Sequence, residues 1–153
     1  MGPPVSISVP VMPLAKPLTI EQIDFIHEWY EYDPRDMWES GYGDGPSGLI
    51  WKKDRGRRAK AGQRAGTTNP QGYWQVRAGS RLIPAQRAVW LLCGGIELPP
   101  HLTIDHINRD PQDNRIENLR PATMKEQVMN RMSYEEEYRR IWGLNRDGRN
   151  CQE

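Results

Sequence analysis

A chain of 153 residues is long enough for one domain with its own hydrophobic core, without disulfides or a structural metal. Its composition, 37% hydrophobic and 27% charged with 14 Gly and 13 Pro, predicts a modest core, long loops and extended ends. The formal net charge is +1 and the two cysteines, Cys93 and Cys151, are far apart, so we expect neither a disulfide scaffold nor a structural zinc site.

Residues 1–17 contain five prolines and no helical period, which predicts an extended N-terminal arm. The arm lacks the basic segment and uninterrupted apolar stretch of a secretory signal. No apolar run in the chain approaches the roughly 20 residues needed to cross a bilayer. We therefore expect a cytoplasmic protein that makes no membrane contact.

Residues 18–46 are expected to form a helix followed by a Gly-rich loop. Thr19 and Gln22 have the spacing of a capping box, which places the start of the helix. Apolar residues then recur at helical spacing as far as Tyr30, and Asp33-Pro34 is predicted to end the helix.

Residues 47–100 are expected to form a small antiparallel sheet and a linking helix. Pro84 suits the first turn of that helix, and Gly94-Gly95 suits its end. Apolar and aromatic runs bounded by turn residues predict three strands, at residues 49–53, 72–77 and 81–83. Gly79-Ser80 is predicted as a tight turn between the last two strands, and residues 55–71 as a long basic loop.

Residues 101–132 are expected to form a strand, loop, strand and helix unit. The strands are predicted at residues 102–107 and 119–122, and Thr123 with Glu126 forms a second capping box at the start of the helix. The tail, residues 133–153, is expected to contain one more helix at residues 135–142. The predicted fold class is therefore α+β.

Positive charge is concentrated in residues 52–87, where ten Lys and Arg residues face a single acid, Asp54. Interleaved with aromatic residues on a two-stranded ribbon, such side chains can neutralise phosphates while neighbouring polar groups reach base edges in the major groove of DNA. Clustered Arg and Lys also often mark only a solvated surface. The residues of this region predicted to contact DNA are Lys52, Lys53, Arg55, Arg57, Arg58, Lys60, Arg64, Trp74, Arg77 and Arg81.

The Asp105-His106 pair offers an acidic metal ligand beside an imidazole, which is what hydrolysis of a phosphodiester requires. Alone, such a dipeptide is most often an ordinary loop pair. Together with Asn118, Asn130, Arg131 and the order of the elements, it resembles the HNH endonuclease family, in particular small phage-encoded HNH homing endonucleases. The resemblance extends from about residue 48 to residue 132, and residues 101–132 resemble the nuclease motif itself.

The resemblance implies specific roles. His106 would be the general base, Asp105 would hold one Mg²⁺ or Mn²⁺ ion, and Asn118 would fix the loop that positions the histidine. A general base must be neutral, so activity is expected to fall as the pH drops through the range in which imidazoles ordinarily titrate. The helix position that is usually His or Asn is Gln127 here, and Asn130 is the alternative metal ligand. Arg115 and Arg131 are candidates for phosphate contacts.

The implied function is metal-dependent cleavage of double-stranded DNA. One such centre cuts one strand, so a monomer would nick, and a double-strand break would require two copies or two events. An alternative is a DNA-binding protein of the same fold that has lost cleavage because Gln127 fails as a ligand. A third hypothesis is a phage packaging or assembly factor with a protein partner, and a phage-encoded protein would act in the cytoplasm of its bacterial host.

Overall fold

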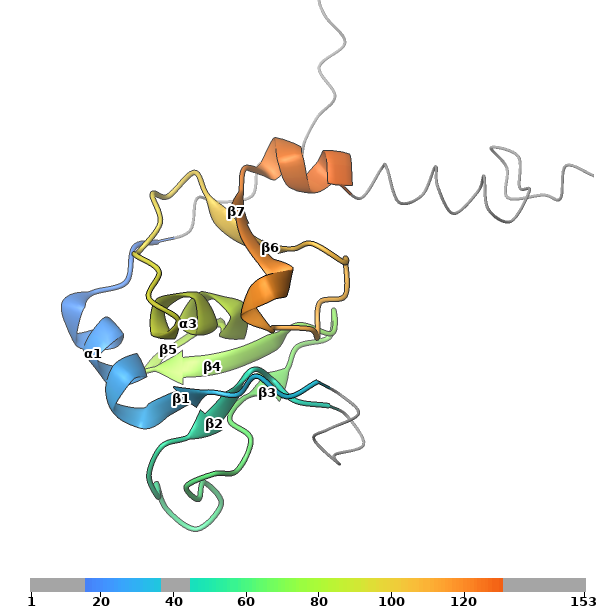
Figure 1. The fold of residues 1–153 in the computed structure, drawn as a ribbon. Helices are drawn as coiled ribbons and strands as arrows, with labels where there is room; N and C mark the ends of the chain where they lie inside the picture. The colour runs from blue at the N-terminus through green and yellow to red at the C-terminus, as the bar shows by residue number, and fades with distance from the viewer. Residues whose placement is uncertain (1–15, 37–44, 131–153) are drawn as a thin grey trace, which may run out of the picture.

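The computed structural model describes residues 16–36 and 45–130, so the predicted helix at residues 135–142 and most of the N-terminal arm lie outside the described residues. The prediction of an α+β fold is confirmed (Figure 1). The elements are α1 (Ile20–Trp29), β1 (Tyr30–Tyr32), β2 (Leu49–Trp51), β3 (Thr67–Thr68), β4 (Trp74–Ala78), β5 (Arg81–Pro84), α3 (Ala85–Leu92), β6 (Thr103–His106), the 3₁₀ turn η1 (Ile116–Asn118) and β7 (Leu119–Ala122), followed by helical residues 124–130.

Helix α1 begins at the predicted capping box. The Thr19 hydroxyl accepts from the Gln22 amide at 3.2 Å, and the Gln22 side chain accepts from the Thr19 amide at 3.0 Å. The helix ends at Trp29, however, and not at Asp33-Pro34. Tyr30 starts β1 because its buried ring places the hydroxyl 2.6 Å from the Arg77 carbonyl, and because β1 pairs antiparallel with β2.

The strands form three small antiparallel sheets, β1-β2, β3-β4-β5 and β6-β7. The predicted turn at Gly79-Ser80 joins β4 and β5. Strand β3 was not predicted, because two exposed threonines inside a polar loop show no alternation. Gly66, with φ +104°, leads into it, and a Cβ at this position would lie 2.8 Å from the Gln75 carbonyl oxygen. Glycine therefore allows β3 to approach β4.

Helix α3 is the centre of the core and lies between the β3-β4-β5 sheet and the β6-β7 hairpin (Figure 1). Its buried face contains Ala85, Ala88, Val89 and Leu91, which pack with apolar residues of α1, β2, β4, β5 and β6. Trp74 belongs to the same core at 2% exposure, so the prediction that its ring contacts DNA is wrong. No helix among the described residues is both long and apolar enough to traverse a lipid bilayer.

Candidate active site

Asp105 and His106 are the last two residues of β6, which pairs with β7 so that Asp105 lies opposite Arg120 and His106 opposite Leu119. Strand alternation sends the two side chains toward different neighbours. The chain turns immediately afterwards, because the Arg109 amide donates to the His106 carbonyl at 3.1 Å. As a result both side chains line one cavity of about 370 Å³.

His106 is 4% exposed, and a buried carboxamide fixes its ring. The Asn114 amide nitrogen lies 2.8 Å from the Ser47 carbonyl oxygen, which can only accept, so Asn114 Oδ1 faces His106 Nε2 at 2.7 Å. The histidine must then donate from Nε2, and a neutral ring carries its lone pair on Nδ1. The geometry therefore assigns Nδ1 as the atom able to accept a proton.

Asn118 holds the loop between β6 and β7. Its Oδ1 accepts from the Asn108 amide at 2.9 Å, and its Nδ2 donates to Asn108 Oδ1 at 2.9 Å and to the Asp113 carbonyl at 2.8 Å. Buried carboxamides with all of these partners satisfied make a rigid loop. Asn118 thus acts on the loop that contains Asn114 and has no contact with the His106 ring among its hydrogen bonds in the described residues.

The helix over residues 124–130 places two carboxamides beside the cavity, and they have different partners. Asn130 Nδ2 lies 3.4 Å from Asp105 Oδ2, while its Oδ1 accepts from Arg109 Nε at 3.3 Å. Gln127 also lines the cavity, but its Nε2 donates to the Thr103 hydroxyl. Asp105 in addition meets Arg120 Nη2 at 3.4 Å. Asn130 is therefore the carboxamide that approaches the Asp105 carboxylate.

Comparison with known protein families gives one match, in which residues 84–129 fit the model of the HNH endonuclease family. Residues 84–129 are therefore similar to an HNH endonuclease domain, and the match covers less than half of the chain. The matched segment begins at the end of β5, contains α3, β6 and β7, and reaches the helix that holds Gln127. No curated protein and no solved structure matched the chain.

The donor groups in this HNH site fit a hard divalent cation. The described residues contain no group of three or more His, Cys, Asp and Glu side chains that could hold a metal. Mg²⁺, however, commonly keeps several waters and takes only one or two protein ligands together with phosphate oxygens. The Asp105 carboxylate offers one such oxygen ligand at the edge of the cavity, and the Asn130 carboxamide can offer a second once its amide, which directs Nδ2 toward Asp105, rotates.

Arg109 also lines the HNH cavity and was missed in the sequence. It is the one described non-glycine residue with positive φ, at +66°, and in the sequence it looks like one more charged residue of a polar loop.

Arg115 makes two hydrogen bonds of 2.8 Å to the Asp113 carboxylate. These bonds hold the pKa of Asp113 below its ordinary value, so the Arg115 guanidinium already has an anionic partner where a phosphate contact was predicted. Arg131 lies outside the described residues.

The basic region of the chain, residues 52–87, contains both paired and exposed cations. Lys53 and Lys60 form ion pairs with Glu28 and Asp54, and the Arg55 guanidinium lies 4.7 Å from the Phe25 ring centroid and 5.0 Å from that of Trp29. Other predicted DNA contacts donate hydrogen bonds to backbone carbonyls. These donors are Lys52, Arg64, Arg77 and Arg81.

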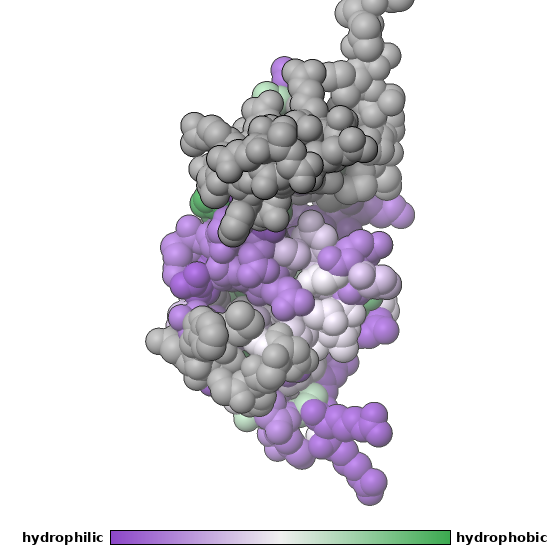
Figure 2. Space-filling model, turned by 90° about the vertical axis from the view of Figure 1, so that its right-hand side faces the viewer, coloured by the Kyte–Doolittle hydropathy of each residue, from purple (hydrophilic) through white to green (hydrophobic). Residues whose placement is uncertain are grey.

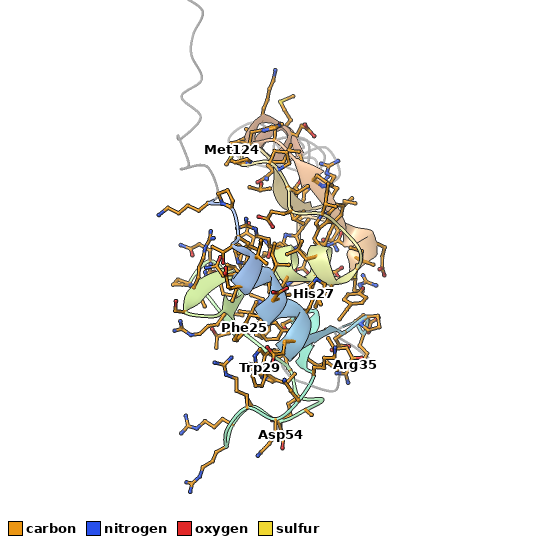
Figure 3. The ribbon with its side chains drawn as sticks, turned by 90° about the vertical axis from the view of Figure 1, so that its left-hand side faces the viewer. Phe25, His27, Trp29, Arg35, Asp54 and Met124 are labelled. Carbon is orange, nitrogen blue, oxygen red and sulfur yellow. The ribbon has the colours of Figure 1, made fainter. Side chains whose placement is uncertain are left out.

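Arg57 and Arg58 are exposed in the loop between β2 and β3, and no hydrogen bond or ion pair to another described residue holds either side chain. Charged side chains from this loop extend away from the body of the molecule, beyond Phe25 and Trp29 and next to Asp54 (Figure 3). In the space-filling view from the opposite side, the same end of the molecule projects hydrophilic side chains (Figure 2). The loop therefore offers exposed positive charge to a polyanion.

Proposed function

We propose that this protein hydrolyses phosphodiester bonds of double-stranded DNA with a bound Mg²⁺ or Mn²⁺ ion. The HNH family match supports a nuclease. The observation that carries the proposal is the single cavity lined by Asp105, His106 and Asn130, in which Asn114 engages His106 Nε2 and leaves Nδ1 to accept a proton.

In the proposed reaction His106 Nδ1 takes a proton from the attacking water. The water oxygen forms the new bond to phosphorus, the bond from phosphorus to the 3′ oxygen breaks, and that oxygen leaves with a proton from solvent. The products are a 5′-phosphate and a 3′-hydroxyl. When bound, the divalent cation neutralises charge on the phosphate and on the departing oxygen. Asn118 contributes by keeping the β6–β7 loop, and hence Asn114, in place.

For the second protein ligand we favour Asn130 over Gln127. The Asn130 carboxamide reaches within 3.4 Å of Asp105, and rotation of its amide presents Oδ1 to a shared cation. The Gln127 amide donates instead to Thr103, a contact that braces the helix against β6. Replacement of the usual His or Asn by Gln127 is therefore compatible with an intact metal site.

One cavity of this kind acts on one strand, so we propose that a monomer nicks duplex DNA and that a double-strand break requires a homodimer or two events. The resemblance to phage homing endonucleases suggests a phage enzyme that acts in the host cytoplasm. The competing hypotheses, a DNA-binding protein without cleavage and a packaging factor with a protein partner, predict different outcomes in the same assay.

The test is relaxation of supercoiled plasmid in Mg²⁺ or Mn²⁺, with EDTA as the metal-free control. Wild-type protein and the matched control His101→Ala, which removes an exposed histidine, should produce open circles, whereas His106→Ala should not. Plasmid that is bound but stays supercoiled with wild-type protein would favour the non-cleaving alternative. A protein partner retained after digestion of all nucleic acid would favour the packaging hypothesis.

A further inference from the structure

The turn between β3 and β4 is rigid and lies outside the matched HNH segment. Asn69 organises it, because its Oδ1 accepts from the amides of Gln71 at 3.0 Å and Tyr73 at 2.9 Å. The Asn69 amide donates to the Tyr73 carbonyl at 2.8 Å, and Gly72 closes the turn with φ +88°. A turn with these bonds presents its side chains in a fixed geometry.

This turn forms part of the wall of the catalytic cavity. Gln71 and Tyr73 line the same cavity as Asp105 and His106, and the Tyr73 ring centroid is 6.0 Å from that of His106. The turn also adjoins the HNH loop, since a Cβ at Gly72 would lie 4.0 Å from both Pro111 and Gln112. The site thus combines the HNH unit with a segment that precedes it in the chain.

Tyr73 has the properties of a ligand contact and not of a core residue. Its side chain is 40% exposed although the next residue, Trp74, is 2% exposed, and no other described residue forms a hydrogen bond with the Tyr73 hydroxyl. At about 370 Å³ the cavity is in the size range of small-molecule sites, about 300–1,000 Å³, and so has room for more than a phosphate group. An exposed ring and a carboxamide beside the reacting groups suit a nucleoside, which has a flat apolar face and polar edges.

We propose that Tyr73 packs against the nucleoside next to the scissile phosphate, and that the neighbouring Gln71 carboxamide hydrogen-bonds to its polar edge. This inference rests on the proposed nuclease function and deepens it, because it makes the β3–β4 turn a substrate-contacting part of the active site. Aromatic stacking on a base that is not stacked in a duplex, as in a small nucleoside ester, is worth about 1–3 kcal/mol when tested by alanine substitution, which corresponds to a loss of about 5- to 150-fold.

Two small phosphodiesters separate this contact from the chemistry. Thymidine 5′-(p-nitrophenyl phosphate) contains a nucleoside, and methyl p-nitrophenyl phosphate contains none. Both report cleavage by release of p-nitrophenol. We expect Tyr73→Ala to lower kcat/KM at least about fivefold for the thymidine ester, mainly through KM, and to leave the methyl ester unchanged. Tyr73→Phe keeps the ring and should keep wild-type activity on both, and Gln71→Ala should weaken only the thymidine ester.

Leu82→Ala is the matched control, because Leu82 is a large apolar residue of similar exposure, 47%, that does not line the cavity. Its ratio of rates on the two esters should equal that of the wild type. Equal loss on both esters in Tyr73→Ala, or no loss on either, would overturn the inference while leaving the nuclease function intact. Failure of the wild type to cleave both esters and plasmid would overturn the nuclease function and this inference with it.

Discussion

The Asn114 carboxamide is the contact on which the orientation of His106 depends, so Asn114→Ala is the most informative single substitution. The side chain is 2% exposed and bonds at 2.8 Å to the Ser47 carbonyl and at 2.7 Å to His106 Nε2. Its removal leaves two buried groups without a partner, each at a cost of about 1–3 kcal/mol. We therefore expect the free energy of unfolding to fall by about 2–6 kcal/mol, within a total of about 5–15 kcal/mol for a domain of this size.

Asn114→Ala should also lower the rate of catalysis by an effect that is separate from the loss of stability. Without Asn114 the imidazole loses the acceptor that keeps its proton on Nε2, so the lone pair on Nδ1 is no longer enforced. General-base catalysis contributes about 10²–10⁴-fold, and we expect Asn114→Ala to lose about 10²-fold in plasmid nicking. Urea denaturation followed by Trp fluorescence measures the first effect, and nicking at a temperature where the variant is folded measures the second.

Gln112→Ala serves as the matched control for Asn114→Ala. Gln112 is an exposed residue of the same loop and does not line the catalytic cavity, so its removal should change neither quantity. Wild-type nicking by folded Asn114→Ala would refute the assignment of Nδ1 as the base. A loss of stability no larger than in Gln112→Ala would refute the two hydrogen bonds as structural contacts.

Three further predictions concern other parts of the molecule. Gly48→Ala should destabilise the protein by about 1–2 kcal/mol or more through backbone strain alone, since Gly48 has φ +87°. It should also reduce nicking, because the new Cβ would lie 2.8 Å from Asn114 Cβ; urea denaturation and the plasmid assay measure the two effects. Replacing both Arg57 and Arg58 by Ala should weaken binding to duplex DNA and leave hydrolysis of the methyl ester unchanged. The slope of the logarithm of the binding constant against the logarithm of the salt concentration should become shallower by about 1–2 units. An unaltered slope would remove the loop from the DNA interface. Asp113→Asn should destabilise the folded protein at pH 7, because Arg115 lowers the pKa of Asp113 in the folded state. The ionised Asp113 carboxylate therefore stabilises the fold at pH values above the ordinary carboxyl range. That contribution is lost as the pH falls through the lowered folded-state pKa, so urea titrations below the ordinary carboxyl range should show a smaller difference from wild type, and a difference that grows toward low pH would contradict the pairing.

Local signals predicted the elements whose formation depends on adjacent residues. The Thr19 capping box starts α1, and β7 occupies the predicted residues 119–122. Tertiary contacts decided the failures. Tyr30 leaves the helical pattern because its hydroxyl donates to Arg77, far along the chain, and β3 exists because β4 supplies its partner. Such contacts leave no periodic pattern in the sequence.

The candidate site also contains residues that adjacent sequence reveals and residues that only tertiary contacts bring together. Asp105 and His106 stand together in the sequence and line one cavity in the structure, although their catalytic roles remain a proposal. Asn114 looks like ordinary turn chemistry in the sequence, because one of its two partners, Ser47, is 67 residues away. Tyr73 enters the cavity only because the β3–β4 turn adjoins the HNH loop. The residues proposed to react were therefore visible in the sequence, whereas the residues proposed to orient them or to bind substrate were not.

Chemical rescue tests most directly whether the His106 ring is the general base. His106→Gly removes a side chain that is 4% exposed but borders a cavity of about 370 Å³, so added imidazole has a route to the vacated position. We predict that His106→Gly binds plasmid without nicking it, and that imidazole restores nicking in a saturable way that increases with the neutral fraction of the imidazole. Folded, DNA-bound His106→Gly that nicks without imidazole, or that imidazole fails to rescue at any pH, would contradict a base at this position.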